Sequence, residues 1–213
     1  MYWQVVRCEC KAEEDRINRE RLLLRSCELP QGSVEYTFEN FERYAGIEEA
    51  YDVALKLAEG SEDLLWLTLQ GDYDCGKTHL LIAICRSWLA RGRPARYAMA
   101  PVLLDELRAG FHPRNEDMSY QERFDFFKNV PLLAIDDLGA ESPTSWAREK
   151  MDTLFDWRHF HRLPLVVTTN LGLKELGGRI HSRLQRFVPS KVVTLKVGEY
   201  RLRRKGAKKC GRN

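Results

Sequence analysis

Short runs of consecutive apolar residues recur along the chain, and longer stretches of mixed polarity separate them. An apolar run of this length is typical of a strand buried on both faces, and the longer stretches are typical of helices. The strands are predicted at 64–69, 95–99, 130–135 and 163–169, with an edge strand at 191–197. The helices are predicted at 7–28, 47–58, 77–91, 101–109, 119–129, 144–161, 173–176 and 178–187. Strands separated by helices predict an α/β fold with a parallel sheet covered on both faces.

The predicted helix at 7–28 stands apart from this alternation, because its charges of both signs are balanced and a Leu-Pro pair ends it. We therefore predict an N-terminal helical extension over residues 1–33 and a core over residues 34–197. Residues 198–213 form a basic tail, and from Lys196 to the end the chain has eight Lys or Arg against one Glu. Such a tail either attracts polyanions through counterion release or is a solvated end, and charge alone does not separate the two.

The composition is that of an ordinary globular protein, with 44% hydrophobic and 31% charged residues among 213. No apolar run approaches the roughly 20 residues of a membrane span, and the first residues lack the apolar core of a signal peptide. The sequence therefore predicts a cytoplasmic protein with no membrane association. Among six cysteines, Cys8 and Cys10 are either reduced thiols or half of a zinc site, for which the spacing supplies no second half.

The motif with the clearest chemistry comes directly after the first predicted core strand. Residues 71–78 read Gly-Asp-Tyr-Asp-Cys-Gly-Lys-Thr, which matches G-x-x-x-x-G-K-[ST]. The glycines let the loop wrap so that backbone N–H groups point at a β-phosphate, and the next helix adds its positive end. Lys77 reaches the β- and γ-phosphates, and Thr78 ligates magnesium. Asp72 and Asp74 are unusual here, and either face solvent or weaken affinity. The predicted nucleotide-binding residues are Gly71, Asp72, Tyr73, Asp74, Cys75, Gly76, Lys77, Thr78 and His79.

Two later strand ends supply polar residues suited to hydrolysis. One predicted strand ends in Asp136 and Asp137, which places both carboxylates at the carboxyl edge of the sheet, where such folds bind ligands. Asp136 would hold a magnesium-bound water, and Asp137 would act as general base on the attacking water. Another strand ends in Thr-Thr-Asn, and Asn170 would orient that water if this strand neighbours both the loop strand and the acid strand. The predicted cofactors are ATP and Mg²⁺, with Thr78 and Asp136 as the metal ligands.

Five segments together carry a resemblance to a known family. They are 36–41 (Tyr-Thr-Phe-Glu-Asn-Phe), 76–80 (Gly-Lys-Thr-His-Leu), 135–139 (Ile-Asp-Asp-Leu-Gly), 168–170 (Thr-Thr-Asn) and 179–184 (Arg-Ile-His-Ser-Arg-Leu). They resemble the DnaC/DnaI helicase loaders and the IstB transposition helpers, which are P-loop NTPases of the AAA+ type. The resemblance implies an AAA+ core without a C-terminal lid domain, which assembles into a nucleotide-dependent homo-oligomer. It also implies single-stranded or duplex DNA as a ligand, and a replicative helicase or a transposase as a partner.

By the same resemblance, Arg183 matches the arginine finger that reaches the ATP of a neighbouring subunit, with Arg179 as the second candidate. The chain departs from the family in its acidic loop and in its short N-terminal region, which resembles the end of a helicase-binding domain. The predicted catalytic residues are Lys77, Asp136, Asp137, Asn170 and Arg183.

The sequence therefore predicts a slow ATPase that acts in DNA replication as a helicase loader. Two alternatives stay open: a transposition helper ATPase, and an ATP-gated adaptor with negligible turnover. The adaptor is favoured by the acidic loop and by Asp137, which is one methylene shorter than the Glu that many ATPases use. A small-molecule kinase would need an arginine-rich lid to exclude water, which the sequence lacks.

Overall fold

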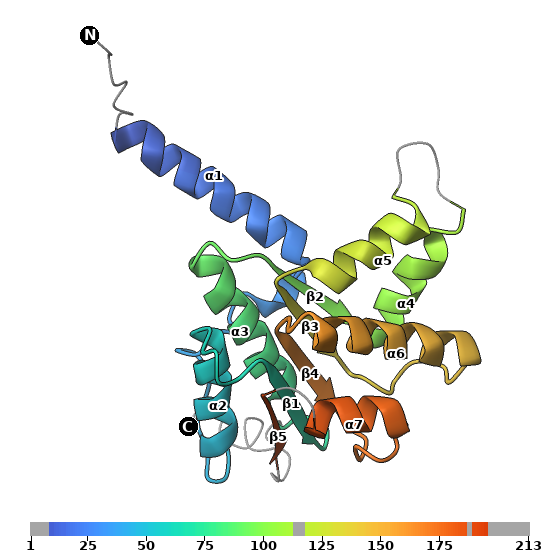
Figure 1. The fold of residues 1–213 in the computed structure, drawn as a ribbon. Coiled ribbons are helices and arrows are strands. Elements are labelled where there is room, and N and C mark those ends of the chain that lie inside the picture. The colour runs from blue at the N-terminus through green and yellow to red at the C-terminus, as the bar shows by residue number, and fades with distance from the viewer. Residues whose placement is uncertain (1–8, 113–117, 187–188, 196–213) are drawn as a thin grey trace, which may run out of the picture.

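The computed structural model describes residues 9–112, 118–186 and 189–195. Within these residues the centre of the fold is a parallel sheet of five strands in the order β2-β3-β4-β1-β5 (Figure 1). The strands predicted from the apolar runs are confirmed, and the last of them is an edge strand, as predicted. Because all strands run in the same direction, the carboxyl ends of β1, β3 and β4 meet at one edge of the sheet. The bounds are β1 (Trp66–Gly71), β2 (Ala95–Met99), β3 (Leu132–Asp136), β4 (Leu165–Thr169) and β5 (Ser190–Leu195).

Three strands, β1, β3 and β4, begin two residues later than the apolar runs indicate. Of these, β3 and β4 start directly behind Pro131 and Pro164. A proline has no N–H group to donate to the sheet, so it ends the hydrogen-bonded ladder rather than continuing it. Its carbonyl group remains available, and the N–H of Leu133 donates to the Pro164 oxygen at 3.3 Å.

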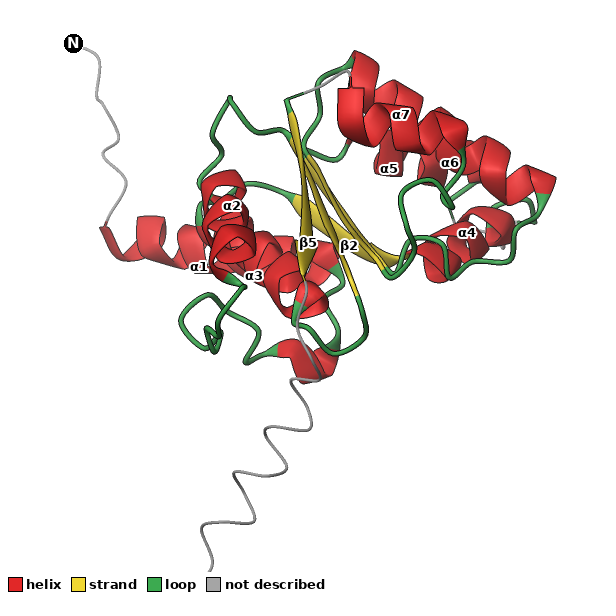
Figure 2. Cartoon of the chain, turned by 90° about the horizontal axis from the view of Figure 1, so that it is seen from below, coloured by secondary structure: helices red, strands yellow, loops and turns green. Residues whose placement is uncertain are grey.

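Helices cover both faces of the sheet (Figure 2). One hydrophobic cluster includes Leu81 and Val166 and lies between the sheet and the helices α2 and α3. The other includes Leu154 and Val167 and lies beneath α4 to α7. Val166 and Val167 are neighbours on β4 but belong to different clusters, as alternation along a strand buried on both faces requires. The predicted α/β fold, with a parallel sheet flanked by helices, is confirmed. The bounds are α2 (Glu48–Ala58), α3 (Lys77–Ala90), α4 (Ala100–Ala109), α5 (Tyr120–Asn129), α6 (Ser145–Phe160) and α7 (Gly178–Arg186).

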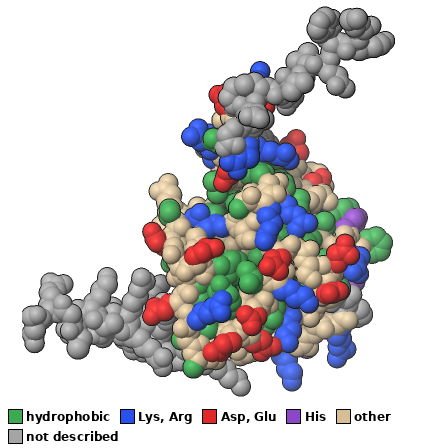
Figure 3. All heavy atoms as spheres, turned by 90° about the vertical axis from the view of Figure 1, so that its left-hand side faces the viewer, with side chains coloured by type: hydrophobic (Ala, Val, Ile, Leu, Met, Phe, Trp, Pro, Cys, Tyr) green, Lys and Arg blue, Asp and Glu red, His purple; other side chains and the backbone are tan. Residues whose placement is uncertain are grey.

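The first helix, α1 (Glu9–Cys27), extends away from the body of the molecule (Figure 1). Figure 3 shows it standing out from the surface, with Lys and Arg side chains beside Asp and Glu. Its end is fixed to the core, because Cys27 is fully buried and the next residue, Glu28, forms an ion pair of 2.5 Å with the buried Arg96. A short 3-10 helix η1 (Gln31–Ser33) then leads into the core. The predicted exposed helix is confirmed.

Several predictions concern parts of the chain outside the described residues. Cys8 and the side chain of Cys10 lie there, as does the basic tail at 198–213, and the predicted absence of a lid domain concerns residues beyond Leu195. These remain predictions. Of the helices that the structure describes, none is both long enough and apolar enough to cross a lipid bilayer.

The helix predicted at 173–176 is wrong, because these residues form a turn. Gly172 stands before the segment, and Gly177 comes after it with a φ of +95°. Four residues between two glycines are too few for a stable helical turn. The turn is closed instead by two hydrogen bonds between the same residues: the N–H of Glu175 donates to the Gly172 oxygen at 2.8 Å, and the N–H of Gly172 donates to Glu175 Oε2 at 2.6 Å.

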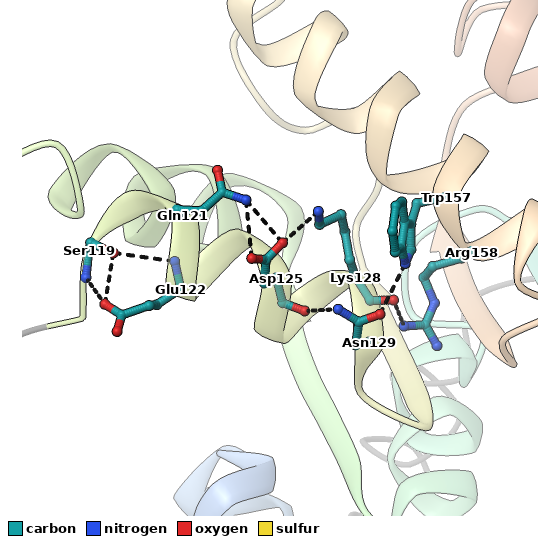
Figure 4. A network of polar contacts seen from close by, with 8 residues as sticks. All are labelled: Ser119, Gln121, Glu122, Asp125, Lys128, Asn129, Trp157 and Arg158. Carbon is teal, nitrogen blue, oxygen red and sulfur yellow. Dashed lines mark hydrogen bonds and ion pairs between the residues drawn. The ribbon is translucent and has the colours of Figure 1, made fainter.

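A buried arginine on α6 contacts the end of α5 and the residues just before β3 and β4, and Figure 4 shows its contact with the Lys128 oxygen. Arg158 is 0% exposed, and its Nη1 and Nη2 atoms donate to main-chain oxygens at 2.5–3.3 Å. Phe127 shows why these oxygens need a donor: the residue four positions later is Pro131, which has no N–H to complete the helical bond. Burial lowers the pKa of Arg158 to about 9, so the guanidinium is still charged at neutral pH. The oxygens belong to Phe127, Lys128, Val130, Pro131 and Pro164.

We expect Arg158→Met to lower the free energy of unfolding by about 3 kcal/mol or more, because a side chain of similar length leaves several buried carbonyl groups without a donor. Denaturant unfolding followed by circular dichroism measures this change. The matched control is Arg148→Met, on an exposed position of the same helix. Equal midpoints for the two variants would show that the carbonyl groups find other donors.

Candidate nucleotide-binding site

The loop between β1 and α3 has a glycine at each end, and both positions require one. A Cβ atom on Gly71 would lie 2.5 Å from the main-chain oxygen of Leu195 on the neighbouring strand. Gly76 has a φ of +89°, and a Cβ atom there would lie 3.0 Å from the Phe41 ring. The next residue, Lys77, begins the 14-residue helix α3, so the loop ends in free N–H groups at the positive end of a helix dipole. This arrangement suits a phosphate group.

Lys77 is the cation of this loop. It is only 5% exposed, and its Nζ atom donates to the oxygens of Gly71 at 3.0 Å and Asp72 at 2.6 Å. Both oxygens belong to neutral carbonyl groups on the loop that would surround a phosphate, and Nζ also contacts Cys75 Sγ at 3.6 Å. The loop therefore contains a buried ammonium that an incoming anion can contact by a small movement of one side chain.

The middle of the loop points outward. Asp72, Tyr73 and Asp74 are exposed, with Tyr73 at 77%, so the two acids face solvent, which was one of the two predicted alternatives. Cys75 is buried instead, and its thiol donates to the main-chain oxygen of Asp72 at 3.0 Å. The Cys75 oxygen in turn accepts a hydrogen bond of 2.5 Å from the Tyr44 hydroxyl. The predicted loop residues thus divide into an inner set that shapes the loop and an outer set on the surface.

Asp136, at the end of β3, connects the loop to the sheet. It is 3% exposed, and its Oδ1 atom accepts a hydrogen bond of 3.1 Å from the Thr78 hydroxyl. This contact joins the two predicted metal ligands across 58 residues of sequence. Two further hydroxyl groups donate to the same carboxylate, from Thr168 at 2.5 Å and from Tyr97 at 3.0 Å.

Asp137 and Asn170 lie beside each other at the same edge. β4 pairs with both β1 and β3, which is the condition under which Asn170 was predicted to act. Burial, followed by the negative charge of Asp136, raises the pKa of Asp137, while Lys77 and the Asn170 amide lower it by a smaller amount. Among the described residues, the buried Oδ1 atom of Asn170 has no hydrogen-bond partner. A buried polar atom of this kind marks a place for a water molecule or a ligand.

A cavity of about 710 Å³ brings these side chains together. Its lining includes Gly76, Lys77, Thr78, Asp137 and Asn170 from the predicted site. Three aromatic residues of the lining, Tyr36, Phe41 and Tyr44, come from the segment before α2, which the sequence did not predict as part of the site. There Tyr36 stacks on His79 with ring centroids 4.8 Å apart, and Phe41 meets His79 edge-on at 5.0 Å.

Arg183 is separate from this cavity. Its Nε atom donates to Asp156 Oδ1 on α6 at 2.6 Å, and both side chains line a different hollow. Arg179, four residues earlier on α7, is exposed. Burial raises the pKa of Asp152 on α6, and the charge of Arg179 opposes this by a smaller amount. Two arginines one turn apart therefore face two acids one turn apart. The structure does not bring Arg183 to the nucleotide loop of its own chain.

The glycine-bounded loop with its buried lysine and its hydroxyl-to-carboxylate contact is that of a P-loop nucleoside triphosphatase, and the strand order is that of an AAA+ core. Residues 33–189, about three quarters of the chain, match the family described as the bacterial DnaA ATPase domain. The chain belongs to this family.

Two curated relatives are replication proteins. The chain is 26% identical over 175 residues to the replicative helicase loader DnaI of Bacillus subtilis (strain 168), which covers 79% of this chain and 55% of DnaI. It is 28% identical over 114 residues to the replicative helicase loader DnaC of Escherichia coli (strain K12), which covers 52% of this chain and 46% of DnaC. The chain thus spans about half the length of these relatives. The predicted resemblance to helicase loaders is confirmed.

Solved structures confirm the fold. The crystal structure of DnaI has a TM-score of 0.65 at 24% identity, over 82% of this chain and 95% of that one. The replication initiator DnaA bound to AMPPCP and single-stranded DNA has a TM-score of 0.66 at 22% identity, over 83% of this chain and 55% of that one.

If Asp137 acts as the predicted general base of ATP hydrolysis, the pH dependence of that reaction should report on its pKa. A general base acts when ionised, so activity falls as the pH drops through its pKa, which is raised here. Because the Asn170 amide lowers that pKa, Asn170→Ala should move the acid limb of the kcat profile to higher pH. The exposed Asn18→Ala on α1 is the control. An acid limb shared by all three proteins would mean that Asn170 does not act on Asp137.

Proposed function

We propose that this chain binds and hydrolyses ATP and acts in DNA replication as a helicase loader. The observation that carries the first part is the hydrogen bond between Thr78 and Asp136 beside a buried Lys77, in a cavity that Asp137 also lines. A hydroxyl, two carboxylates and an ammonium at the end of a phosphate-binding loop are the set that phosphoryl transfer from a nucleotide uses.

The side chains present fit ATP with magnesium. The loop N–H groups and Lys77 would hold the phosphates, and Thr78 and Asp136 would hold Mg²⁺. Mg²⁺ takes most of its ligands from phosphates and water, so one hydroxyl and one carboxylate are enough on the protein side. When bound, the ion would neutralise charge on the phosphates. Asp137 would take a proton from the attacking water on its carboxylate, and Asn170 would orient that water with its unpartnered Oδ1 atom.

The role in replication rests on the relatives. DnaI and DnaC are named replicative helicase loaders, and DnaA has been seen with AMPPCP and single-stranded DNA. We infer from them a replicative helicase as the partner, DNA as a ligand and the cytoplasm as the location. A transposase partner remains the alternative for the same fold.

A second candidate function is an ATP-gated adaptor with negligible turnover. Asp137 favours it in two ways: its φ is +53°, an unusual backbone conformation for a residue other than glycine, and burial raises the pKa of its carboxyl group, which disfavours the ionised form that a base needs. Binding would then depend on Lys77 as before, while hydrolysis would be too slow to matter.

Two substitutions separate binding from turnover. We expect Lys77→Ala to abolish ATP binding in a fluorescent-nucleotide titration, because it removes the buried cation of the loop. Asp137→Asn should keep the affinity and suppress phosphate release. The surface changes Lys174→Ala and Asp63→Asn are the matched controls. Unchanged affinity in Lys77→Ala would contradict nucleotide binding at this loop, and a parent protein that binds ATP without measurable turnover would favour the adaptor.

We also propose that Arg183 completes the site of a neighbouring subunit, since it lies outside its own cavity on α7, paired with Asp156 of α6. Arg183→Ala should bind ATP normally and lose about 10³-fold or more in turnover. Mixing it with Lys77→Ala protein should restore activity that rises with total concentration, as pairing between subunits requires. Arg186→Ala, exposed on the same helix, is the control. Normal turnover in Arg183→Ala at every concentration would contradict the role.

A further inference from the structure

The Asp136 carboxylate lies within a set of three hydroxyl groups. Oδ1 accepts hydrogen bonds from Thr78 and Thr168, and Oδ2 accepts one from Tyr97. An ionised carboxylate has about four acceptor positions in all. Three are occupied by these hydroxyls, and both positions on Oδ1 are among them. The position that remains is therefore on Oδ2, at the side that Tyr97 leaves open.

Alternation along the strands brings these groups to one face of the sheet. Tyr97, Ala134 and Val166 all belong to the hydrophobic cluster beneath α3. Asp136 and Thr168 stand two residues further along β3 and β4, so they point to that same face. The first turn of α3 lies above them with its threonine. The hydroxyls from β2, from β4 and from α3 thus converge on the end of β3 as a consequence of the strand order.

Thr168 makes a second contact that Tyr97 does not. Its Oγ1 atom donates to Asp136 and also accepts a hydrogen bond of 2.9 Å from the N–H of Asp137. A hydroxyl has one proton and two lone pairs, so it can serve both partners at once. The accepted bond fixes the backbone at Asp137, where φ is +53°. One buried side chain therefore holds the carboxylate of the first acid and the main chain of the second.

Tyr97 remains a donor under all ordinary conditions. Burial, followed by the negative charge of Asp136, raises the pKa of its phenol well above the usual value. The ring itself is one more buried side chain of the cluster, and a phenylalanine would fill the same space. The hydroxyl is thus the part of Tyr97 that acts on the site, and it can be removed without opening a large cavity.

We propose that Tyr97 and Thr168 are positioning residues of the hydrolysis site. Their hydroxyls fix the rotation of the Asp136 carboxylate, so that its remaining acceptor position is available to the hydration shell of the magnesium ion that accompanies ATP. Thr168 also fixes the turn that aims Asp137. This inference rests on the proposed ATPase function, and it assigns roles to two residues that belong to neither the phosphate loop nor the pair of acids.

The first experiment measures magnesium rather than rate. A fluorescent ATP analogue is titrated with Mg²⁺ for the parent and for Tyr97→Phe, and binding is also measured in EDTA. We expect unchanged affinity in EDTA and about a tenfold rise in the Mg²⁺ concentration at half-saturation, which is the usual effect of losing a hydrogen bond to a metal-holding side chain. The control is Tyr51→Phe, whose buried hydroxyl donates to the Phe38 oxygen at 3.3 Å. Equal magnesium requirements in all three proteins would overturn the role of Tyr97.

The second experiment uses the conservative pair at Thr168. Thr168→Ser keeps the hydroxyl and both hydrogen bonds, whereas Thr168→Val keeps the shape and removes them. We expect the valine variant to raise the magnesium requirement and to lower kcat, and the serine variant to restore both. Thr68→Val, a buried threonine on β1, controls for the loss of a hydroxyl from the sheet. A serine variant as impaired as the valine variant would mean that packing, not hydrogen bonding, matters at this position.

The two proposals fail in different ways. If the parent protein does not bind the ATP analogue, the proposed function is wrong. If the parent binds it and requires Mg²⁺ while the two hydroxyl variants behave like their controls, only the positioning roles are wrong.

Discussion

An ionised carboxylate that is almost fully removed from water needs donors, since burying it alone would cost several kcal/mol. Asp136 has this requirement at the end of β3, and the elements around it supply the donors. Tyr97 comes from β2, Thr168 from β4 and Thr78 from the first turn of α3. Any shift in strand register would separate these groups. The same contacts that satisfy the charge therefore also hold the phosphate loop at a fixed position relative to the sheet.

Much of this arrangement could be predicted from the sequence, because it depends on local patterns. The motif at 71–78 and the acid pair after an apolar run are each readable in a few consecutive residues. Tyr97 is not, since its contact with Asp136 depends on which strands are neighbours. The alternation of side chains along a strand could have indicated it. Tyr97 stands two residues before the end of β2, so its side chain lies on the face of the sheet beneath α3. Tyr44 had no comparable signal, because it lies in an irregular segment that reaches the loop only in the fold.

The errors in the predicted elements have a related origin. The apolar residues begin before the hydrogen-bonded ladder does. The runs that include Pro131 and Pro164 therefore led to predicted starts that are two residues too early for β3 and β4. Pro131 has no N–H to donate to the Phe127 oxygen, and Arg158 supplies that donor from α6. In the sequence this arginine is one charge among many on an amphipathic helix. It is buried because carbonyl groups outside the helix need hydrogen-bond donors, and no sequence pattern within the helix indicates this.

The backbone of Asp137 shows how these contacts at the edge of the sheet affect the proposed catalysis. A φ of +53° costs energy for a residue with a side chain, and such strain persists only where surrounding contacts enforce it. Here the N–H of Asp137 is held by Thr168, whose hydroxyl is itself held by Asp136. The conformation of the proposed general base therefore depends on the same buried carboxylate that would serve the metal.

An Asp, one methylene shorter than Glu, reaches less far from its backbone, so the position of that backbone determines what it can contact. The rate of hydrolysis would then be set by the rigidity of this turn, and the chain of contacts from Asp136 through Thr168 is what makes the turn rigid.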